Sequence, residues 1–163
     1  MDRTVSCRTF VSYIDRSREY YAAQGYESPY AWPHHDEVPF STLGKPLAQC
    51  RVGLVTTAQR NQPGLLMPIR ELYAAPSSPA PTRMRTDDLS WDKQATHTDD
   101  VDSFLPLNRL SEMAAAGRIG SLSPRFYGVP TDYSQSNTIQ RHAPQILTWC
   151  RQDSVDAVLL AGL

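Results

Sequence analysis

Hydrophobic residues recur at intervals of three and four positions in three segments of the chain, which is the pattern of an amphipathic helix. The first segment covers residues 9–25, with aromatic and aliphatic side chains on one face and charged ones between them. Gly25 can adopt the left-handed conformation that ends a helix. The second segment begins after Pro106, which suits a first helical turn, and ends at Gly117. Both segments therefore predict helices with defined ends.

A third helical segment runs from Ser134 or Ser136 to Cys150. Pro144 lies inside it, where a proline removes a backbone hydrogen bond or bends the helix. The apolar positions that we expect this helix to bury are Ile139, Ala143, Ile146, Leu147 and Cys150.

Two short apolar segments have the pattern of strands buried on both faces of a parallel sheet. They are residues 51–57 (RVGLVTT) and residues 156–161 (DAVLLA). Residues 60–95 show little periodicity, so no element is predicted there. Within them, residues 74–88 (AAPSSPAPTRMRTDD) are typical of an exposed loop or a partly disordered linker.

The order strand, helix, helix, strand predicts an α/β fold, a three-layer sandwich with a mainly parallel sheet. Residues 1–46 are expected to form an N-terminal helix and an extended, proline-rich arm, and residues 47–163 the α/β domain. Strands of such a sheet normally lead into a covering helix. We therefore expect a domain that is incomplete at its C-terminus, truncated after its last strand, and prone to form oligomers or aggregates through exposed apolar surface.

The composition narrows the functional classes. The 163 residues are 40% hydrophobic and 20% charged, with a net charge of −1. This balance is typical of soluble globular proteins and gives no field that would gather nucleic acid or an anionic membrane. No segment approaches the roughly 20 apolar residues that span a bilayer, and the first ten residues lack the apolar core of a signal peptide. We expect a cytoplasmic protein that binds neither nucleic acid nor membrane.

The three cysteines argue against a disulfide framework and against a structural zinc site. Cys7, Cys50 and Cys150 are odd in number, widely spaced and free of any CxxC pattern. Free cysteine behaves as a small hydrophobic residue, so we expect these thiols to be buried.

Residues 96–104 (THTDDVDSF) combine an imidazole with three carboxylates, those of Asp99, Asp100 and Asp102. His97 beside carboxylates can serve as a general base or as a metal ligand, although an acidic loop is often simply solvated. His34, His35 and Asp36 are a weaker metal candidate. Adjacent histidines in an extended segment point to opposite sides, so at most one would face a given site.

Residues 120–128 (GSLSPRFYG) are expected to form a loop that is rich in hydroxyl groups and carries one guanidinium. Ser123 and Arg125 could clamp a carboxylate or a phosphate, with the arginine binding through two parallel hydrogen bonds. The alternative is a turn with a surface arginine. No GxSxG, Walker or Rossmann glycine pattern is present, and the spacing of residues alone defines no reaction.

Several motifs together resemble one family. They are YIDRSREYYAAQGYESPYAWPHHDEVPF, KPLAQCRVGLVTTA, THTDD, FLPLNRLSEMAAAGRIGSLSPRFYG and SVDAVLLAGL. In order and spacing they are similar to the selenoprotein B family of glycine, sarcosine, betaine and D-proline reductases. The most specific of them are KPL with RVGLVTT, the segment RLSEMAAAGRIGSLSPR, and VDAVLL.

The resemblance implies reductive cleavage of a carbon–nitrogen bond in an amino acid or its N-methyl derivative, with electrons from a thioredoxin-type thiol donor. In this family a cysteine or selenocysteine follows the strand that corresponds to residues 156–161. The expected nucleophile would therefore follow Leu163, at an in-frame UGA codon, and the chain would be the N-terminal part of a selenoprotein that by itself lacks the redox residue. A position between a strand and the next helix N-terminus stabilises a thiolate or selenolate.

The resemblance also implies where the substrate binds. It places substrate-binding residues at strand ends and in loops, namely Thr56, Thr57, His97, Asp100, Ser123 and Arg125, and no catalytic or metal-binding residue in this chain. It implies no cofactor here, but a pyruvoyl group in a partner subunit. Two alternatives stay open: a non-catalytic scaffold or regulatory subunit of such a complex, and a metal-dependent lyase or hydrolase that uses His35 and His97.

Overall fold

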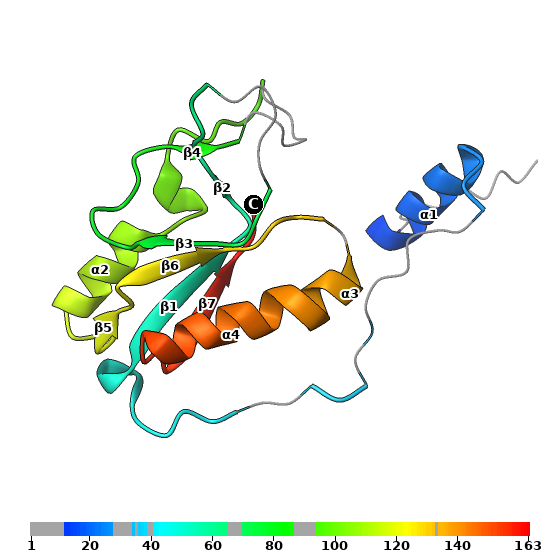
Figure 1. The fold of residues 1–163 in the computed structure, drawn as a ribbon. Helices are drawn as coiled ribbons and strands as arrows, with labels where there is room; N and C mark the ends of the chain where they lie inside the picture. Colours follow the sequence, from blue (N-terminus) through cyan, green and yellow to red (C-terminus); the bar gives the residue numbers. More distant parts are fainter. Residues whose placement is uncertain are drawn as a thin grey trace, which may run out of the picture. The chain divides into compact units, whose positions relative to one another are not determined.

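The computed structural model describes residues 12–27, 34, 36–38, 41–64, 70–86, 94–132 and 134–163. The chain divides into two compact units, residues 1–39 and residues 40–163, so the boundary falls before the one after residue 46 that the sequence suggested. The described helix of the first unit is α1 (Tyr13–Ala23), and all described strands belong to the second unit (Figure 1).

Helix α1 confirms the first predicted helix. Ser12 caps its N-terminus, since the Ser12 hydroxyl accepts a hydrogen bond from the Asp15 backbone N–H at 3.2 Å. The chain leaves the helix through Gly25, whose φ of 84° is left-handed as expected. Among the residues of α1, none is buried. Its aromatic side chains, including Tyr13 and Tyr20, therefore lie exposed within their unit.

The second unit is built on a five-stranded mixed sheet that is mostly parallel, which confirms the predicted α/β class. Its strands are β1 (Arg51–Thr56), β3 (Tyr73–Pro76), β5 (Ser121–Leu122), β6 (Arg125–Gly128) and β7 (Ala157–Ala161). Strand β1 is central: β7 runs parallel along one side of it, and β5 and β6 pair with the start and the end of its other side. Strand β3 is antiparallel to β6.

Helices pack on both faces of the sheet, as a three-layer sandwich requires. Val52 and Leu54 of β1 belong to one apolar cluster with Leu107 and Leu110 of α2 (Leu107–Ala115). Val55 belongs to a second cluster on the opposite face, with side chains of α4 (Ala143–Gln152). Figure 1 shows α2 and α4 on the two sides of the sheet. Alternate side chains of β1 therefore pack into two separate apolar clusters, one on each face of the sheet.

The predicted strand at residues 156–161 is present, but its expected burial on both faces is wrong. Val158 is 43% exposed, Leu159 41% and Leu160 76%. Paired residues of parallel strands face the same side, so Leu159 shares the face of Leu54 and α2, and Leu160 the face of Val55 and α4. In the part of the chain that the structure describes, no strand pairs with the outer side of β7. Apolar surface is thus exposed on both faces of this edge strand.

Residues 120–128 are not the loop that the sequence suggested. They form β5 and β6, interrupted at Ser123 and Pro124, because Phe126 and Tyr127 are large side chains that bury on opposite faces of the sheet. The Ser123 backbone N–H still donates to the Val52 carbonyl at 2.8 Å, whereas Pro124 has no N–H to donate.

The third predicted helix consists of α3 (Gln135–Asn137), a π-helical turn (Thr138–His142) and α4. Pro144 is the second residue of α4, one residue after the π turn, and its missing N–H removes a donor from the helical ladder as expected. The expected burial of Ile139, Ala143 and Leu147 is wrong, since all three are exposed.

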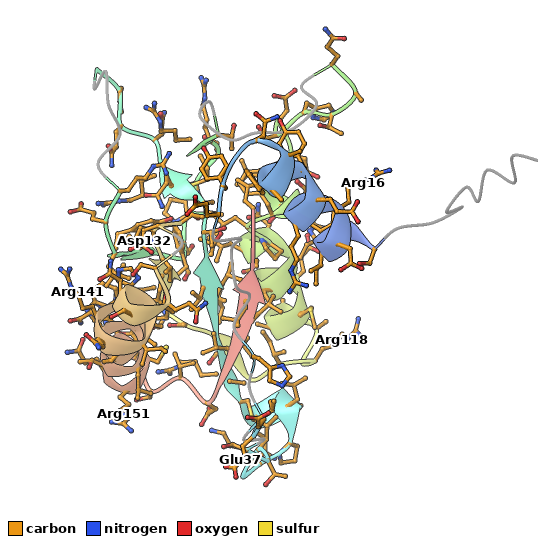
Figure 2. The ribbon with its side chains drawn as sticks, turned by 90° about the vertical axis from the view of Figure 1, so that its right-hand side faces the viewer. Arg16, Glu37, Arg118, Asp132, Arg141 and Arg151 are labelled. Carbon is orange, nitrogen blue, oxygen red and sulfur yellow. The ribbon has the colours of Figure 1, made fainter. Side chains whose placement is uncertain are left out.

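The buried stripe of this helix lies about one residue away from the expected one. It consists of the buried His142 and Cys150 and the partly buried Ile146 and Trp149, spaced at four, three and one residues, and Ile146 and Cys150 are two of the expected positions. On the same segment Arg141 and Arg151 point away from the sheet (Figure 2). The helix therefore packs through its aromatic and cysteine positions, while Ile139 and Leu147 face outward.

The expectation that residues 74–88 form an exposed loop or linker is wrong at residues 74–76 and 84–85, which are in strands, while residues 87–88 lie outside the described residues. They contribute β3 and β4 (Met84–Arg85), and Met84 is buried. Strand β4 pairs antiparallel with β2 (Gln59–Arg60) in a small separate sheet. The strands were missed because they are short and rich in alanine, proline and arginine, which are uncommon in strands.

Helix α2 confirms the second predicted helix, with Pro106 directly before it and Gly117 at a φ of 67° after it. Two short 3₁₀ helices complete the unit, η1 (Leu47–Gln49) and η2 (Val101–Ser103). Cys50 and Cys150 are buried free thiols, as expected, while Cys7 lies outside the described residues. None of the helices in the described ranges is long and apolar enough to cross a bilayer.

Candidate functional site

The carboxyl ends of β1 and β7 lie side by side, and Thr57 joins them. Its hydroxyl accepts a hydrogen bond from the Leu163 backbone N–H at 2.8 Å and donates one to the Leu163 carbonyl at 3.2 Å. One side chain thereby holds both backbone groups of Leu163. Ligands of open α/β sheets bind at this edge, and Thr57 lies there, while its substrate-binding role stays a prediction.

Thr56 does not share that position. Its side chain is buried, and its hydroxyl accepts a hydrogen bond from the Ala58 backbone N–H at 3.1 Å. Thr56 therefore shapes the turn after β1, and its hydroxyl is occupied inside the protein.

Tyr73 fixes the same turn from the neighbouring strands. Its hydroxyl donates a hydrogen bond to the Ala58 carbonyl at 2.5 Å, and the Arg60 guanidinium lies 4.9 Å from the centre of its ring. Burial raises the pKa of the Tyr73 hydroxyl, and the positive charge of Arg60 only partly opposes this rise. Tyr73 is therefore a neutral hydrogen-bond donor that immobilises the backbone next to Thr57.

In the acidic loop, which is residues 96–104, Asp100 and Asp102 cap helices. The Asp100 carboxylate accepts a hydrogen bond from the Asp102 backbone N–H at the start of η2, at 3.1 Å. Asp102 accepts hydrogen bonds from the backbone N–H and the side-chain amide of Asn108, at 3.0 Å and 2.8 Å, near the start of α2. Both arrangements satisfy backbone donors that a helix leaves unpaired. The geometry gives Asp100 a structural role at this point.

His97 and Asp99 of the same loop face solvent. Their side chains are 74% and 92% exposed, and His97 Nδ1 lies 3.7 Å from the Asp99 carboxylate. His34 and Asp36 form a comparable exposed pair at 3.2 Å, while His35 lies outside the described residues. Within the described ranges, no group of three or more histidine, cysteine or acidic side chains could hold a metal ion.

A hollow of about 400 Å³ opens between β4 and the acidic loop. It is lined by Thr82, Arg83, Met84, Thr86, Thr98, Asp99 and Val101. The hydroxyl oxygens of Thr86 and Thr98 lie 2.7 Å apart and tie the two walls together. Thr82, Arg83 and Thr86 were not among the site residues predicted from the sequence. The alternation of polar and apolar residues in TRMRT, with Met84 buried at its centre, was the available signal.

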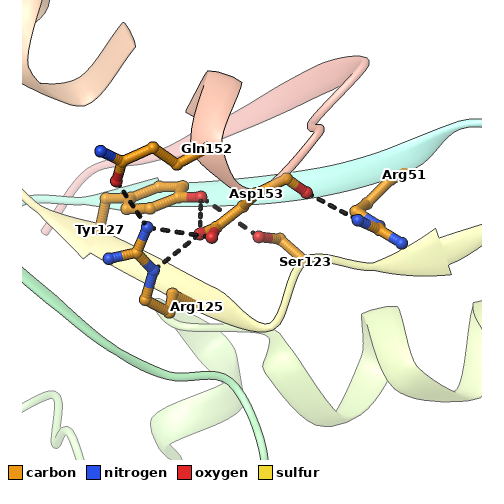
Figure 3. A network of polar contacts seen from close by, with 6 residues as sticks. All are labelled: Arg51, Ser123, Arg125, Tyr127, Gln152 and Asp153. Carbon is orange, nitrogen blue, oxygen red and sulfur yellow. Dashed lines mark hydrogen bonds and ion pairs between the residues drawn. The ribbon is translucent and has the colours of Figure 1, made fainter. Parts of the chain in front are cut away.

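Ser123 and Arg125 belong to a different place, at the turn between α4 and β7. Arg125 donates two hydrogen bonds to the Asp153 carboxylate, from Nε at 2.8 Å and from Nη2 at 2.9 Å. Tyr127 donates to the same carboxylate at 2.6 Å, and the Ser123 hydroxyl oxygen lies 3.2 Å from the Tyr127 hydroxyl oxygen (Figure 3). Arg51, at the start of β1, donates to the Asp153 carbonyl at 2.8 Å.

This network lies at the amino edge of the sheet, because Asp153 precedes β7 and Arg51 begins β1. It is therefore separated from Thr57 by the length of β1, and the structure does not bring these predicted residues together. Burial raises the pKa of the Asp153 carboxyl, but the hydrogen bonds from Arg125 and Tyr127 outweigh it and leave that pKa below its usual value. The Arg125 guanidinium thus neutralises a charge of the protein itself.

Cys150 adjoins the network but has the wrong environment for a nucleophile. Its side chain is buried in the cluster with Val55 and Tyr127. Burial raises the pKa of the Cys150 thiol, so the reactive thiolate is disfavoured. Cys50 is also buried, and its thiol donates weakly to the carbonyls of Lys45 and Pro46.

Comparisons of the chain with protein-family models, with curated proteins and with solved structures found no match. The similarity of the sequence motifs to the selenoprotein B family therefore stays a prediction.

Proposed function

We propose that residues 40–163 belong to a thiol- or selenol-dependent reductase that cleaves a carbon–nitrogen bond of an amino acid or its N-methyl derivative. The observation that carries the proposal is the double hydrogen bond between Thr57 and Leu163. It fixes the end of β7 beside the end of β1, where α/β enzymes place reacting groups. The resemblance to the selenoprotein B family places the redox residue directly after this point.

The exposed faces of β7 support the same assignment. Val158, Leu159 and Leu160 present apolar side chains on both sides of the sheet. Strands of three-layer α/β folds are covered by helices on both faces, so this surface suits further α/β structure that continues from β7. The buried state of Cys50 and Cys150 also supports a nucleophile supplied from beyond these residues.

The proposed reaction takes two electrons and two protons. The carbon–nitrogen bond breaks and the carbon gains a hydrogen, while two thiol groups of a thioredoxin-type donor become a disulfide. The nitrogen leaves as ammonia or an amine, or stays in the product as a primary amine where the broken bond belongs to a ring. A pyruvoyl group in a partner subunit would hold amine substrates as the family implies, and this chain carries no cofactor. Thr57 contributes by fixing the Leu163 backbone, and Tyr73 by fixing the turn at Ala58.

A non-catalytic subunit is the second candidate function. The same exposed β7 could pack against a partner that carries the redox residue, because an uncovered edge strand is a template for pairing. In that case the chain would position the partner's reacting group beside Thr57 without reacting itself.

The genomic DNA after the Leu163 codon distinguishes the two. An in-frame TGA followed by coding sequence with a nearby cysteine and a further helix-and-strand pattern supports the reductase. A different stop codon with no coding frame behind it overturns the single-chain reductase. The full-length product should then release ammonia from glycine, methylamine from sarcosine or trimethylamine from betaine, or open the ring of D-proline to 5-aminopentanoate. The reaction should require a dithiol, and the variant with the redox residue replaced by alanine is the control.

A further inference from the structure

Strand β7 has a free edge, and the backbone bonds of its neighbour β1 show which residues of β7 bond outward. The Val52 carbonyl faces the side of β5 and β6, because it accepts a hydrogen bond from the Ser123 backbone N–H at 2.8 Å. The Arg51 carbonyl faces β7, because it accepts one from the Asp156 backbone N–H at 2.9 Å. Successive residues of a strand direct their backbone groups to opposite sides, so the odd-numbered residues of β1 bond to β7.

The parallel register of β1 and β7 then assigns the backbone groups of β7. Leu159 lies opposite Leu54, whose two neighbours are odd-numbered residues that bond to β7, so the Leu159 N–H and C=O face β1. The N–H and C=O groups of Val158 and Leu160 therefore point away from β1, toward the outer edge. In the described part of the chain, no strand pairs with that edge. The edge thus offers two residues that are symmetric about Leu159.

We infer that β7 pairs antiparallel with β7 of a second copy of the chain, around a two-fold axis at Leu159. In this arrangement Val158 lies opposite the partner's Leu160, and Leu160 lies opposite the partner's Val158. Opposite residues whose backbone groups both point into the gap exchange two N–H···O bonds. The sheets of the two copies thereby join into one continuous sheet, and the outward groups of Val158 and Leu160 gain partners.

The exposed side chains of β7 also match across this axis. Directly opposite residues of an antiparallel pair lie on the same face of the sheet, within contact distance. On the face of α4, Val158 contacts the partner's Leu160, and on the face of α2, Leu159 contacts the partner's Leu159. Val158, Leu159 and Leu160 are all partly or largely exposed in the single copy. The pairing therefore removes apolar surface from water on both faces.

A second copy suits this edge better than an unrelated strand does. Residues 157–161 (AVLLA) contain no charged residue and no proline, which are features by which natural edge strands block pairing. An identical strand meets no like-charge repulsion here, and the two-fold axis gives its outward groups the matching spacing. Because β7 is only five residues long, it buries less area than a standard interface. We therefore expect a reversible dimer.

The pairing does not depend on the reductase chemistry. Helices that continue from β7, as the proposed function implies, would cover the faces of the sheet and leave its edge free. Self-association can therefore fail while the reductase stands, and the reductase can fail while self-association stands.

Amide hydrogen exchange of the full, ¹⁵N-labelled chain tests the pairing. Over about a hundredfold range of protein concentration, dimerisation by mass action should slow the exchange of the Val158 and Leu160 amides about tenfold. The Leu159 amide faces β1 and should exchange slowly at every concentration, which makes it the internal control.

A self-linking cysteine tests the position of the axis. Leu159→Cys, in a Cys7→Ser background, places two thiols opposite each other at a pair whose Cα atoms lie about 4.5 Å apart. This separation suits a disulfide, so mild oxidation should give a covalent dimer. Leu160→Cys is the matched control: it is more exposed, but it lies diagonally from its own copy, at roughly 7–8 Å, and should not link. Cys50 and Cys150 are buried and do not compete.

Three results would overturn the pairing. Slow exchange of the Val158 and Leu160 amides at the lowest concentration would show that the edge is covered within one chain. Fast exchange of both amides at every concentration would show that no second copy binds. Disulfide formation by Leu160→Cys as readily as by Leu159→Cys would show that the axis does not lie at Leu159. A cysteine variant with an altered amide spectrum is set aside, and exchange in the parent protein then decides.

Discussion

Arg125 and Asp153 form a two-bond ion pair that joins the start of β6 to the turn before β7, across 28 residues of sequence. The Asp153 side chain is only 11% exposed and also accepts the Tyr127 hydroxyl hydrogen bond. All three donors to this carboxylate come from β6, so the carboxylate holds β6 against the turn before β7, while Arg51 of β1 bonds to the Asp153 backbone carbonyl. The pair is thus a structural element of the sheet, although its arginine has the chemistry of a substrate clamp.

Asp153→Ala should lower the free energy of unfolding by about 2–4 kcal/mol, because it leaves the Arg125 guanidinium and the Tyr127 hydroxyl without their acceptor. Urea unfolding followed by circular dichroism measures this loss. Arg151→Ala, at an exposed position of the same helix end, is the control and should stay within about 0.5 kcal/mol of the parent protein. Equal stability of the two variants would contradict the structural role of the pair.

The stability of the protein should fall in acid, partly through Asp153. Its folded-state pKa lies below the ordinary value of about 3.9 in unfolded chains, so the unfolded state binds a proton more readily. The stabilisation is therefore complete well above pH 4 and is lost as the pH falls through the folded-state pKa. The free energy of unfolding, measured as a function of pH, should therefore fall less steeply in acid for Asp153→Asn than for the parent protein.

The acid profile needs one further comparison, because the pKa values of Asp132 and Asp156 are also lowered by their hydrogen bonds. Both carboxyls remain in Asp153→Asn and titrate there as in the parent protein. The difference between the two profiles from pH 7 to pH 3 therefore isolates Asp153. A difference that stays constant over that range would show that its ionisation does not contribute.

Gly128→Ala should destabilise the protein by about 1–3 kcal/mol, because the added Cβ would overlap the Tyr73 ring. The ring cannot move freely, since its hydroxyl is bonded to the Ala58 carbonyl. Gly44→Ala is the matched control, because nothing lies within 4 Å of its added Cβ. Thermal unfolding of both variants checks the expectation, and a Gly128→Ala protein as stable as the control would show that Tyr73 is not held in place.

The sequence predicted the parts of the fold whose local pattern agrees with their environment. Strand β1 and helices α1 and α2 were found because their apolar spacing and terminal glycines act locally. Strands β3 and β6 were missed, since they depend on pairing with each other and on burial of Tyr73, Phe126 and Tyr127. Their identity as strands is decided by tertiary contacts that residue spacing does not contain.

The candidate site divides in the same way. Thr57 follows a recognisable buried strand, so its place at the carboxyl edge could be predicted. The role of Arg125 could not be predicted, because its partner Asp153 is distant in sequence. An arginine that binds a ligand carboxylate has the same local sequence pattern as one that binds a carboxylate of the protein. The hollow at Arg83 was hidden because its two walls come from segments that meet only through Thr86 and Thr98.

Thr57→Val should release Leu163, because valine keeps the shape of threonine but can neither accept from the Leu163 N–H nor donate to its carbonyl. We expect the Leu163 amide to exchange its hydrogen about tenfold faster, which corresponds to the loss of roughly one net hydrogen bond. Thr57→Ser retains the hydroxyl and should protect this amide nearly as well as threonine does. Unchanged exchange in Thr57→Val would remove the support for a fixed carboxyl edge.

The chain should self-associate through β7, and Leu160→Glu should prevent it. Leu160 is 76% exposed on an edge strand, so a charge there repels a second apolar surface without disturbing a packed core. The free energy of unfolding should stay within about 0.5 kcal/mol, as for other surface substitutions. Sedimentation velocity measures the change from oligomer to monomer. Ile139→Glu, at an exposed apolar position of the π-helical turn, is the control and should leave the oligomer intact. A parent protein that is already monomeric would contradict association through this strand, because the exposed faces of Val158, Leu159 and Leu160 would then be tolerated in water.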